Sequence, residues 1–284
     1  MTASQHMVQA NGLRFRTMAD GPADGEMVIL LHGFPEGAES WSKQVDALAK
    51  AGALAVAPDM RGYGLSDAPS RVEDYRIDDL VEDVAGIIKA FGRTSAHVGG
   101  HDWGAAVAWY FASVHPEMTK TLTVLSVGHP TALADATAND KDQQERSRYV
   151  GLFLVEGKAE SVLSEDDHKR LRAMLGSSIP AGVVDHFVRS LARPGRLTAG
   201  LNYYRANLER DRAWTDLRRD VTVAAPTVLL WGDQDPALGR LQAEDTARHM
   251  TGEYRLEVLE GAGHWLQFER PDEVSRALVE AVSK

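Results

Sequence analysis

One pentapeptide of this 284-residue chain has the composition of a sharp turn that presents a reactive side chain. Gly100-His101-Asp102-Trp103-Gly104 joins the apolar run SAHVGG to the helical pattern AAVAWYFASV, so a strand passes through a tight turn directly into a helix. Small residues two positions either side of Asp102 permit a strained elbow that lifts the central side chain above the sheet edge. Because Asp is also a common N-cap, the pentapeptide alone leaves an ordinary capped loop open.

A carboxylate at the tip of such an elbow predicts a different reaction from the serine that is more common there. A serine must lose its proton before it attacks an acyl carbon, whereas Asp102 is already anionic at neutral pH. It can displace a leaving group from an sp3 carbon, and the product of that step is an alkyl ester of the aspartate. The sequence therefore predicts covalent catalysis with Asp102 as the nucleophile.

Two further strand ends carry groups that such a reaction needs. The run MVILL ends in His32-Gly33-Phe34-Pro35-Glu36, and in this architecture the amides of Phe34 and Trp103 would form an oxyanion hole. The last predicted strand ends in Gly261-Ala262-Gly263-His264-Trp265, whose glycines allow a sharp bend that places an imidazole over the sheet as a base. Taken alone, the first segment is only a turn, and the segment of His264 fits a base and a histidine in a surface loop equally well.

The loop after PTVLLWG offers two carboxylates that could orient this base, Asp233 and Asp235. We expect Asp235 to hold the imidazole of His264 and Asp233 to be a turn or capping residue. The rival position after TLTVLSV, Gly128-His129-Pro130, offers no carboxylate. The order Asp102, Asp235, His264 matches the nucleophile, acid and base order of triads on α/β sheets, which favours a catalytic triad.

These side chains need a sheet whose strand ends lie side by side, and the apolar runs supply it. VQANGLRFRTM predicts a hairpin that turns at Asn11-Gly12. Strands buried on both faces are predicted at MVILLHG, ALAVAPD, SAHVGGHD, TLTVLSV, PTVLLWGD and YRLEVLEG. Several of them are separated by helical patterns, at Trp41 to Lys50, Ile77 to Phe91, Ala105 to Val114 and Pro271 to Val282. Repeated β-α-β units of this kind predict a mostly parallel sheet flanked by helices.

The alternation stops between Val127 and Pro226, where about 90 residues have a helical and charged pattern. We interpret this insertion as a lid over the sheet. Its helices are expected over Gln143 to Val155, Glu165 to Leu175, Ala181 to Leu191 and Leu197 to Leu208. The predicted organisation is a core domain of residues 1–130 and 219–284 with a helical lid domain of residues 131–218.

The composition restricts the partners and the location of the protein. With 31 Lys and Arg against 41 Asp and Glu, the formal charge of −10 argues against nucleic-acid binding, since no basic run offsets it. The absence of Cys excludes disulfides and a cysteine nucleophile. No secretion signal and no apolar run near the roughly 18 residues of a membrane span is found, so we expect a cytoplasmic protein without membrane insertion. His97 and His101 straddle a strand and an elbow, so no metal is expected.

Five motifs together resemble the epoxide hydrolase branch of the α/β-hydrolase family, along essentially the whole chain: HGFPE, PDMRGYGLSD, GHDWGA, WGDQDP and GAGHW. The resemblance implies the α/β-hydrolase fold, with a mostly parallel eight-stranded sheet flanked by helices and an inserted helical lid. It also implies two lid tyrosines that hold and protonate the epoxide oxygen, which RSRYVGLF and LNYYRANLE place at Tyr149 and Tyr204. The chain departs from the branch at Tyr203 and Arg148, where Trp is frequent, and at Leu154, where Gln is frequent.

The resemblance further implies the reaction, hydrolysis of a small apolar epoxide by water to a vicinal diol, without a cofactor. The pocket around the nucleophile is expected to include Phe34, Pro35, Trp103, Phe153 and Trp265. From spacing alone, each of the two lid tyrosines would be a helix-packing residue with its hydroxyl at the surface. Their assignment to the epoxide oxygen therefore rests on the resemblance.

Two other functions stay open at this stage. A haloalkane dehalogenase would use the same nucleophile, and Trp103 suits a halide donor, but Phe34 and a lone tryptophan near the end of the lid, Trp214, leave the second donor unsupplied. Dehalogenases of the fluoroacetate type carry Arg where this chain has Trp103 and Ala106. The second is a non-catalytic receptor for a small apolar molecule. The sequence does not fix the oligomeric state, and a homodimer is compatible with it.

Overall fold

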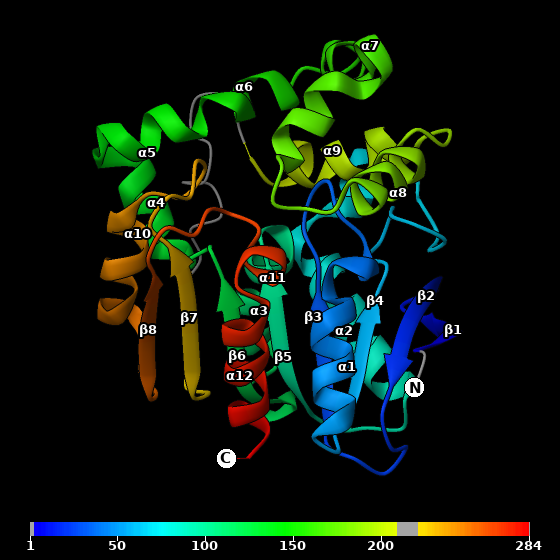
Figure 1. The fold of residues 1–284 in the computed structure, drawn as a ribbon, viewed down its shortest axis with the longest axis vertical. Helices are drawn as coiled ribbons and strands as arrows, with labels where there is room; N and C mark the ends of the chain where they lie inside the picture. The colour runs from blue at the N-terminus through cyan, green and yellow to red at the C-terminus, as the bar shows by residue number, and fades with distance from the viewer. Residues whose placement is uncertain (1–2, 209–220, 284) are drawn as a thin grey trace.

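The computed structural model describes residues 3–208 and 221–283. Its centre is one sheet of eight strands in the order β1-β2-β4-β3-β5-β6-β7-β8 (Figure 1). The pairs β1–β2 and β2–β4 are antiparallel, and the other neighbouring pairs are parallel. This arrangement confirms the predicted mostly parallel sheet. The strands are β1 Ser4–Ala10, β2 Leu13–Asp20, β3 Met27–Leu31, β4 Leu54–Pro58, β5 Ala96–His101, β6 Thr119–Leu125, β7 Thr227–Gly232 and β8 Tyr254–Leu259.

The antiparallel edge begins with the predicted hairpin. Asn11 and Gly12 have φ angles of 46° and 75°, in the left-handed region that these two residue types tolerate best. Ala10 pairs with Leu13 across the turn, and the register continues to Ser4 opposite Ala19. The Asn-Gly pair therefore fixes the register of the first two strands.

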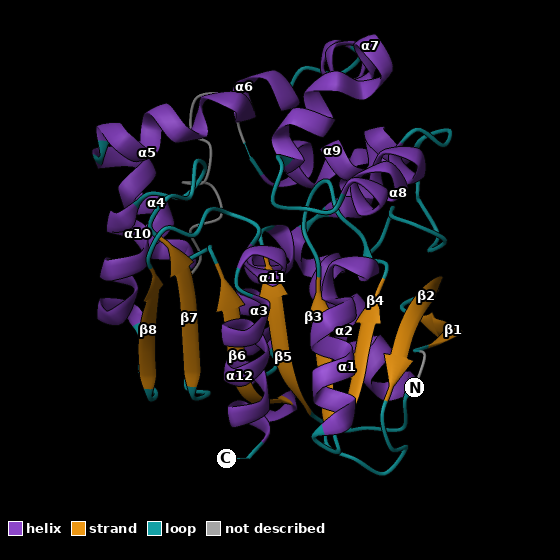
Figure 2. Ribbon diagram, viewed as in Figure 1, coloured by secondary structure: helices purple, strands orange, loops and turns teal. Residues whose placement is uncertain are grey.

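Helices cover both faces of the sheet (Figure 2). They are α1 Ser42–Lys50, α2 Ile77–Ala90, α3 Trp103–Val114, α10 Arg240–Asp245, α11 Leu266–Glu269 and α12 Pro271–Val282, with short 3-10 turns at Ala38–Trp41, Val72–Tyr75, Pro116–Met118 and Thr246–His249. Val28 and Leu30 of β3 pack into the hydrophobic core that α1 and α12 share, whereas Ile29 and Leu31 pack into the core that α2 and α3 share. Successive side chains of a strand point to opposite faces, so one apolar strand supplies both cores.

β8 differs from the prediction that the apolar runs form strands buried on both faces. β3, β4 and β5 are buried along their whole length, but no residue of β8 is fully buried and Val258 is 38% exposed. β8 is the last strand of the sheet, so it has a neighbour on one side only. The run YRLEVLEG contains Arg255 and Glu257, which point to an edge position that its apolar residues obscure.

The segment from residue 130 to residue 207 lies over the carboxyl ends of the parallel strands (Figure 1). Its helices are α4 Pro130–Asn139, α5 Lys141–Arg146, α6 Val150–Phe153, α7 Lys158–Leu175, α8 Ala181–Leu191 and α9 Arg196–Asn207, with a 3-10 turn at Ser147–Tyr149. The division into a core and a lid domain stays a prediction. Its boundary between residues 218 and 219, like Trp214, falls outside the described residues.

Two of the predicted lid helices are wrong in their bounds, while α8 has the bounds that the sequence predicts. The stretch expected as one helix from Gln143 to Val155 is instead α5, the 3-10 turn and α6 in succession. α7 begins seven residues before the predicted start at Glu165 and is irregular over Glu165–His168. Its start is set by Glu160, whose carboxylate accepts the amide of Gly157, a capping signal without the usual Ser or Thr.

Candidate active site

Asp102 stands at the turn between β5 and α3 in a conformation that presents its side chain. Its φ and ψ angles are 51° and −122°, and its side chain forms no capping hydrogen bond to α3. A Cβ atom on Gly104 would lie 2.1 Å from the carbonyl oxygen of Leu31, and one on Gly100 would lie 2.4 Å from the oxygen of Gly104. Both flanking positions therefore require glycine, and Asp102 is not a simple helix N-cap.

The two carboxylate oxygens of Asp102 are buried and face different groups. Oδ1 accepts a hydrogen bond of 2.8 Å from the amide of Phe34, and the amide of Trp103 also hydrogen-bonds to the carboxylate. Oδ2 lies 3.8 Å from Nε2 of His264. Burial raises the pKa of Asp102, while the imidazole and the two amides act in the opposite direction. The two amides expected to form an oxyanion hole thus both contact the carboxylate of the expected nucleophile.

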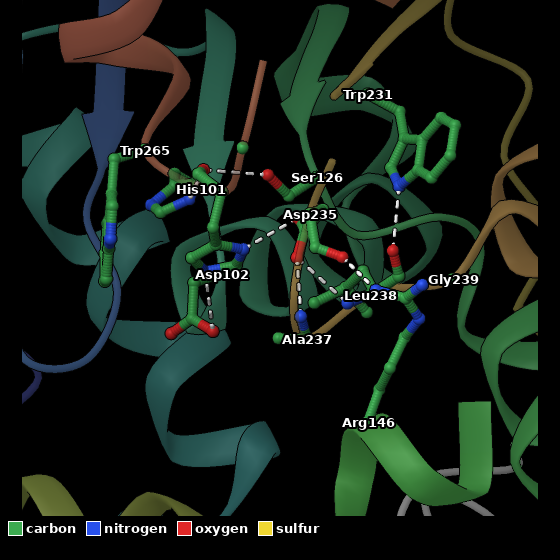
Figure 3. A network of polar contacts seen from close by, with 12 residues as sticks. His101, Asp102, Ser126, Arg146, Trp231, Asp235, Ala237, Leu238, Gly239 and Trp265 are labelled. Atoms are coloured by element: carbon green, nitrogen blue, oxygen red, sulfur yellow. Dashed lines mark hydrogen bonds and ion pairs between the residues drawn. The ribbon is translucent and has the colours of Figure 1, made fainter. Parts of the chain in front are cut away.

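His264 contacts Asp235 with the ring nitrogen that points away from Asp102. Nδ1 of His264 donates to Oδ2 of Asp235 over 2.8 Å, and Oδ1 of Asp235 accepts the amides of Ala237 and Leu238 at 2.8 and 2.9 Å (Figure 3). Every oxygen of Asp235 is therefore used, and its side chain is fixed in one orientation. This orientation leaves Nε2 of His264 as the nitrogen that faces the cavity.

The charges of this buried group determine the protonation of the imidazole. Burial alone lowers the pKa of His264, but the carboxylates of Asp235 and Asp102 outweigh it and raise the pKa to about 9. Burial likewise raises the pKa of Asp235, and the imidazole and the two amides reverse that shift, so its pKa lies below the ordinary value. At neutral pH the imidazole is therefore protonated between two carboxylates.

A buried glutamate-histidine pair that no local sequence pattern indicates lies behind His264. Oε2 of Glu36 is 2.8 Å from Nδ1 of His101, and Nε2 of His101 donates to the carbonyl oxygen of His264 over 2.9 Å. The hydroxyl of Ser126 donates to the same carbonyl over 3.1 Å (Figure 3). Glu36 and His101 lie in two of the motifs, HGFPE and GHDWGA, but neither motif indicates that the two side chains meet. Their contacts fix the backbone that carries the imidazole.

Tyr149 and Tyr204 come together although they belong to different segments of the chain. Their ring centroids are 6.5 Å apart, their hydroxyls are hydrogen-bonded to each other, and the ring of Trp103 packs edge-on against that of Tyr204. Tyr204 is buried and Tyr149 is half-buried, so neither is a packing residue with its hydroxyl at the surface. Burial and the nearby charge of Asp102 raise the pKa of both phenols, which keeps them protonated and able to donate.

One cavity of about 510 Å³ is lined by Asp102, His264, Tyr149 and Tyr204. The rest of its wall is mainly apolar, as is usual in pockets that bind small organic molecules. Three of the expected pocket residues line it: Phe34, Phe153 and Trp265. Three apolar lid residues that were not expected line it as well: Leu152, Leu163 and Met174. The four polar groups therefore share one largely apolar cavity.

Pro35 and Trp103 do not line this cavity, in contrast to what the sequence analysis expects. Both residues are buried in the body of the protein. The ring of Trp103 packs edge-on against those of Tyr203 and Tyr204, with centroids 5.8 and 5.1 Å apart. Trp103 thus contacts the carboxylate of Asp102 through its backbone while its side chain lies in the core, and spacing in the sequence does not reveal this direction.

The remaining motifs have structural contacts. Asp233 lies in a turn, as predicted, and its carboxylate accepts the amide of Gly261 over 2.7 Å, which joins this turn to the loop after β8. Nδ1 of His97 is 2.8 Å from the Thr121 hydroxyl. Among residues 3–208 and 221–283, no group of three His, Cys, Asp or Glu side chains could hold a metal ion. In the same residues, none of the helices combines the length and the hydropathy that crossing a membrane requires.

Comparison with known proteins agrees with this geometry. The sequence model of the alpha/beta hydrolase fold family matches residues 26–271. The chain is 36% identical to the AB hydrolase superfamily protein YfhM of Bacillus subtilis over 96% of each chain. It is 34% identical to Epoxide hydrolase A of Mycobacterium tuberculosis over 98% of this chain and 96% of that one. The crystal structure of Epoxide Hydrolase A from Mycobacterium thermoresistibile superposes with a TM-score of 0.86 at 33% identity, over 99% and 98% of the two chains.

An elbow that carries a carboxylate at the end of a parallel strand and a family match over most of the chain define the class: the protein belongs to the α/β-hydrolase family. Within that family it belongs to the epoxide hydrolase branch, since relatives named as epoxide hydrolases match it from end to end in sequence and in structure. The protein is therefore an enzyme, a hydrolase, as the motifs predict.

Proposed function

We propose that the protein hydrolyses small apolar epoxides to vicinal diols through an alkyl ester on Asp102. One observation carries the proposal: a buried carboxylate, an imidazole 3.8 Å from it and two phenols line the same cavity. The relatives named as epoxide hydrolases support the same reaction. Each of these groups suits one step of the chemistry.

In the first step, Oδ2 of Asp102 attacks a carbon of the epoxide ring, and the carbon-oxygen bond of the ring breaks. Oδ2 is the oxygen suited to attack because Oδ1 is occupied by the amide of Phe34. The ring oxygen takes a proton from Tyr149 or Tyr204. Because the pKa of either phenol is raised, the phenolate that remains is a strong base and readily takes up a proton again. General-acid help of this kind contributes about 10² to 10⁴ in rate.

Ester formation also releases the base for the second step. The ester carries no charge, so one of the two carboxylates that raise the pKa of His264 is removed when Asp102 is alkylated. The imidazolium can then return a proton to the phenolate, which leaves a neutral imidazole and a neutral phenol. The same ionic contact that holds His264 protonated in the resting enzyme thus disappears when a base is needed.

In the second step, the neutral His264 takes a proton from water as the water oxygen attacks the carbonyl carbon of the ester. The negative charge that develops on Oδ1 of Asp102 is stabilised by the amides of Phe34 and Trp103. The bond to the diol oxygen then breaks, and this oxygen takes up the proton of the new carboxylic acid. The products are the diol and the starting state, an Asp102 carboxylate with a protonated imidazole.

Dehalogenation is less well supported because the Trp103 side chain does not line the cavity where a halide would leave. Its ring packs edge-on against the rings of Tyr203 and Tyr204. The second tryptophan weighed for that role, Trp214, lies outside the described residues. The two phenols, in contrast, belong to the cavity wall.

Product analysis of the purified protein tests the proposal. Matched panels of aryl and alkyl epoxides and haloalkanes are incubated with the wild type and with Asp102→Ala, and diol and free halide are measured. Diol from epoxides alone, lost in the variant, is the expected result. Halide release without diol would assign the protein to the dehalogenases, and no turnover on either panel would favour a ligand-binding role.

A further inference from the structure

The loop that carries Asp235 is held from the lid side by two residues of one helix. Gln143 of α5 donates from Nε2 to the carbonyl oxygen of Ala237 over 2.9 Å, and its Oε1 accepts the amide of Gly239 over 2.8 Å. Arg146 of the same helix donates from its guanidinium to the carbonyl oxygen of Asp235 itself (Figure 3). These three contacts join a helix above the sheet to the backbone of the acid loop.

The neighbouring contacts leave the acid loop little freedom once α5 is in place. The Trp231 indole donates to the carbonyl oxygen of Leu238 over 3.0 Å from the strand below the loop (Figure 3). The amide of Leu238 also reaches back to Oδ1 of Asp235. The Gln143 side chain is completely buried, so water cannot replace a hydrogen bond that it loses to the loop. Separating the loop from α5 would therefore leave buried polar atoms unsatisfied, which costs free energy. The loop backbone is therefore fixed between β7 and α5.

We propose that Gln143 and Arg146 are positioning residues for the catalytic acid, which couple the seating of α5 to the orientation of Asp235 toward His264. This inference rests on the proposed function, because it assigns these contacts to the hydrolysis of the ester. Nδ1 of His264 donates to Oδ2 of Asp235 over 2.8 Å, a contact that depends on where the loop backbone holds the carboxylate. Second-sphere partners of this kind tune a catalytic imidazole without touching the substrate.

The groups proposed for the first chemical step, the opening of the epoxide ring, are held by contacts other than those of Gln143 and Arg146. Tyr149 follows α5 in the chain, but its ring packs against Phe153 and Tyr204, with centroids 5.2 and 6.5 Å apart. The nucleophile is held by the amide of Phe34, far from α5 in sequence. Loss of the α5 contacts should therefore impair water activation by His264 more than the opening of the epoxide ring.

Single-turnover kinetics with styrene oxide and an excess of enzyme separate the two steps. Intact-protein mass spectrometry after an acid quench gives the rates at which the ester on Asp102 forms and decays. Gln143→Met and Arg146→Met should slow decay by about 10- to 100-fold, as a misplacement of about 1 Å does, and change formation by about threefold or less. Arg146→Lys, which keeps the cation, should recover part of the loss. The control is Arg148→Met, because Arg148 is exposed and pairs only with Glu145 in the described part of the chain.

The pKa of His264, measured by NMR on protein with 15N-labelled histidine, supplies a readout that needs no turnover. Asp235 raises this pKa, so a displaced acid loop should lower it in Gln143→Met and Arg146→Met but not in Arg148→Met. The proposal is overturned if folded variants keep the wild-type pKa, or if both rates fall equally. If the wild type forms no ester, the proposed function fails, while the NMR comparison still decides whether α5 positions Asp235.

Discussion

Replacing Asp102 by Asn should lower the pKa of His264, because this carboxylate is one of the two charges that hold the proton on the imidazole. Oδ2 of Asp102 lies 3.8 Å from Nε2 of His264. Coulomb's law at that distance gives about 4 kcal/mol with an effective dielectric constant near 20, and about 1 kcal/mol with that of water. At about 1.4 kcal/mol per pH unit, the pKa should fall by about one to three units from its wild-type value of about 9.

The assay is a titration of histidine 15N chemical shifts from acidic to alkaline pH in the wild type and in Asp102→Asn. Asn keeps the shape of the side chain and an oxygen for the amide of Phe34, so the variant removes mainly the charge. Asp233→Asn is the control, because Asp233 accepts the amide of Gly261 instead of contacting the imidazole. A pKa in Asp102→Asn within about 0.3 units of the wild type would refute the ionic account of how the base is released.

The lid phenols, the elbow and the charged imidazole can each be perturbed separately. Tyr149→Phe combined with Tyr204→Phe should lower kcat/KM for epoxides by about 10² to 10⁴, and substantial retained turnover would show that the phenols do not protonate the ring oxygen. Gly104→Ala should lower the free energy of unfolding by about 3 kcal/mol or more, because the new Cβ would lie 2.1 Å from a backbone oxygen. The control Gly151→Ala, where nothing lies within 4 Å of the new Cβ, should change it by less than about 1 kcal/mol. Equal effects of the two substitutions in urea unfolding would argue against the elbow. The raised pKa of His264 contributes stability that is complete below about pH 6.5 and is lost as the pH rises to about 9, so the urea midpoint should fall across that window, and by less in Asp102→Asn.

The chemistry of the site could be predicted where a reactive residue follows a buried strand. Asp102, Asp235 and His264 all stand at the carboxyl ends of apolar runs, and parallel strands bring such ends to one edge of the sheet. The glycines around Asp102 and His264 gave a further local signal, because these turns need residues without a Cβ. Proximity in space therefore followed from sequence alone for these three side chains.

Contacts between distant segments could not be predicted in this way. Glu36 and His101 are separated by 65 positions, and nothing local to either indicates that they meet beneath His264. Gln143 lies on a lid helix whose amphipathic pattern gives no sign of a partner in the loop after β7. Side-chain direction was equally hidden for Trp103, whose backbone contacts the nucleophile while its ring points into the core. Such features depend on how the elements pack, which periodicity does not encode.

The lid was harder to predict than the sheet for a related reason. The strands of the core follow a simple rule of apolar runs, but the helices of the lid are bounded by weak signals. α7 is interrupted at Glu165–His168, and a 3-10 turn divides α5 from α6, although the sequence has no Pro or Gly at either place. Tyr149 lies in that turn, so the position of one proposed catalytic group depends on the least predictable part of the chain.

A single turnover in water enriched in 18O tests the central claim, that the reaction proceeds through an ester on Asp102, most directly. With enzyme in excess over styrene oxide, water attacks the carbonyl carbon of the ester, so the diol of the first turnover should contain no 18O. The peptide that includes Asp102 should gain one 18O atom, which mass spectrometry of the digested protein detects. Immediate appearance of 18O in the diol, with an unlabelled Asp102 peptide, would mean that water attacks the epoxide directly and would contradict the account.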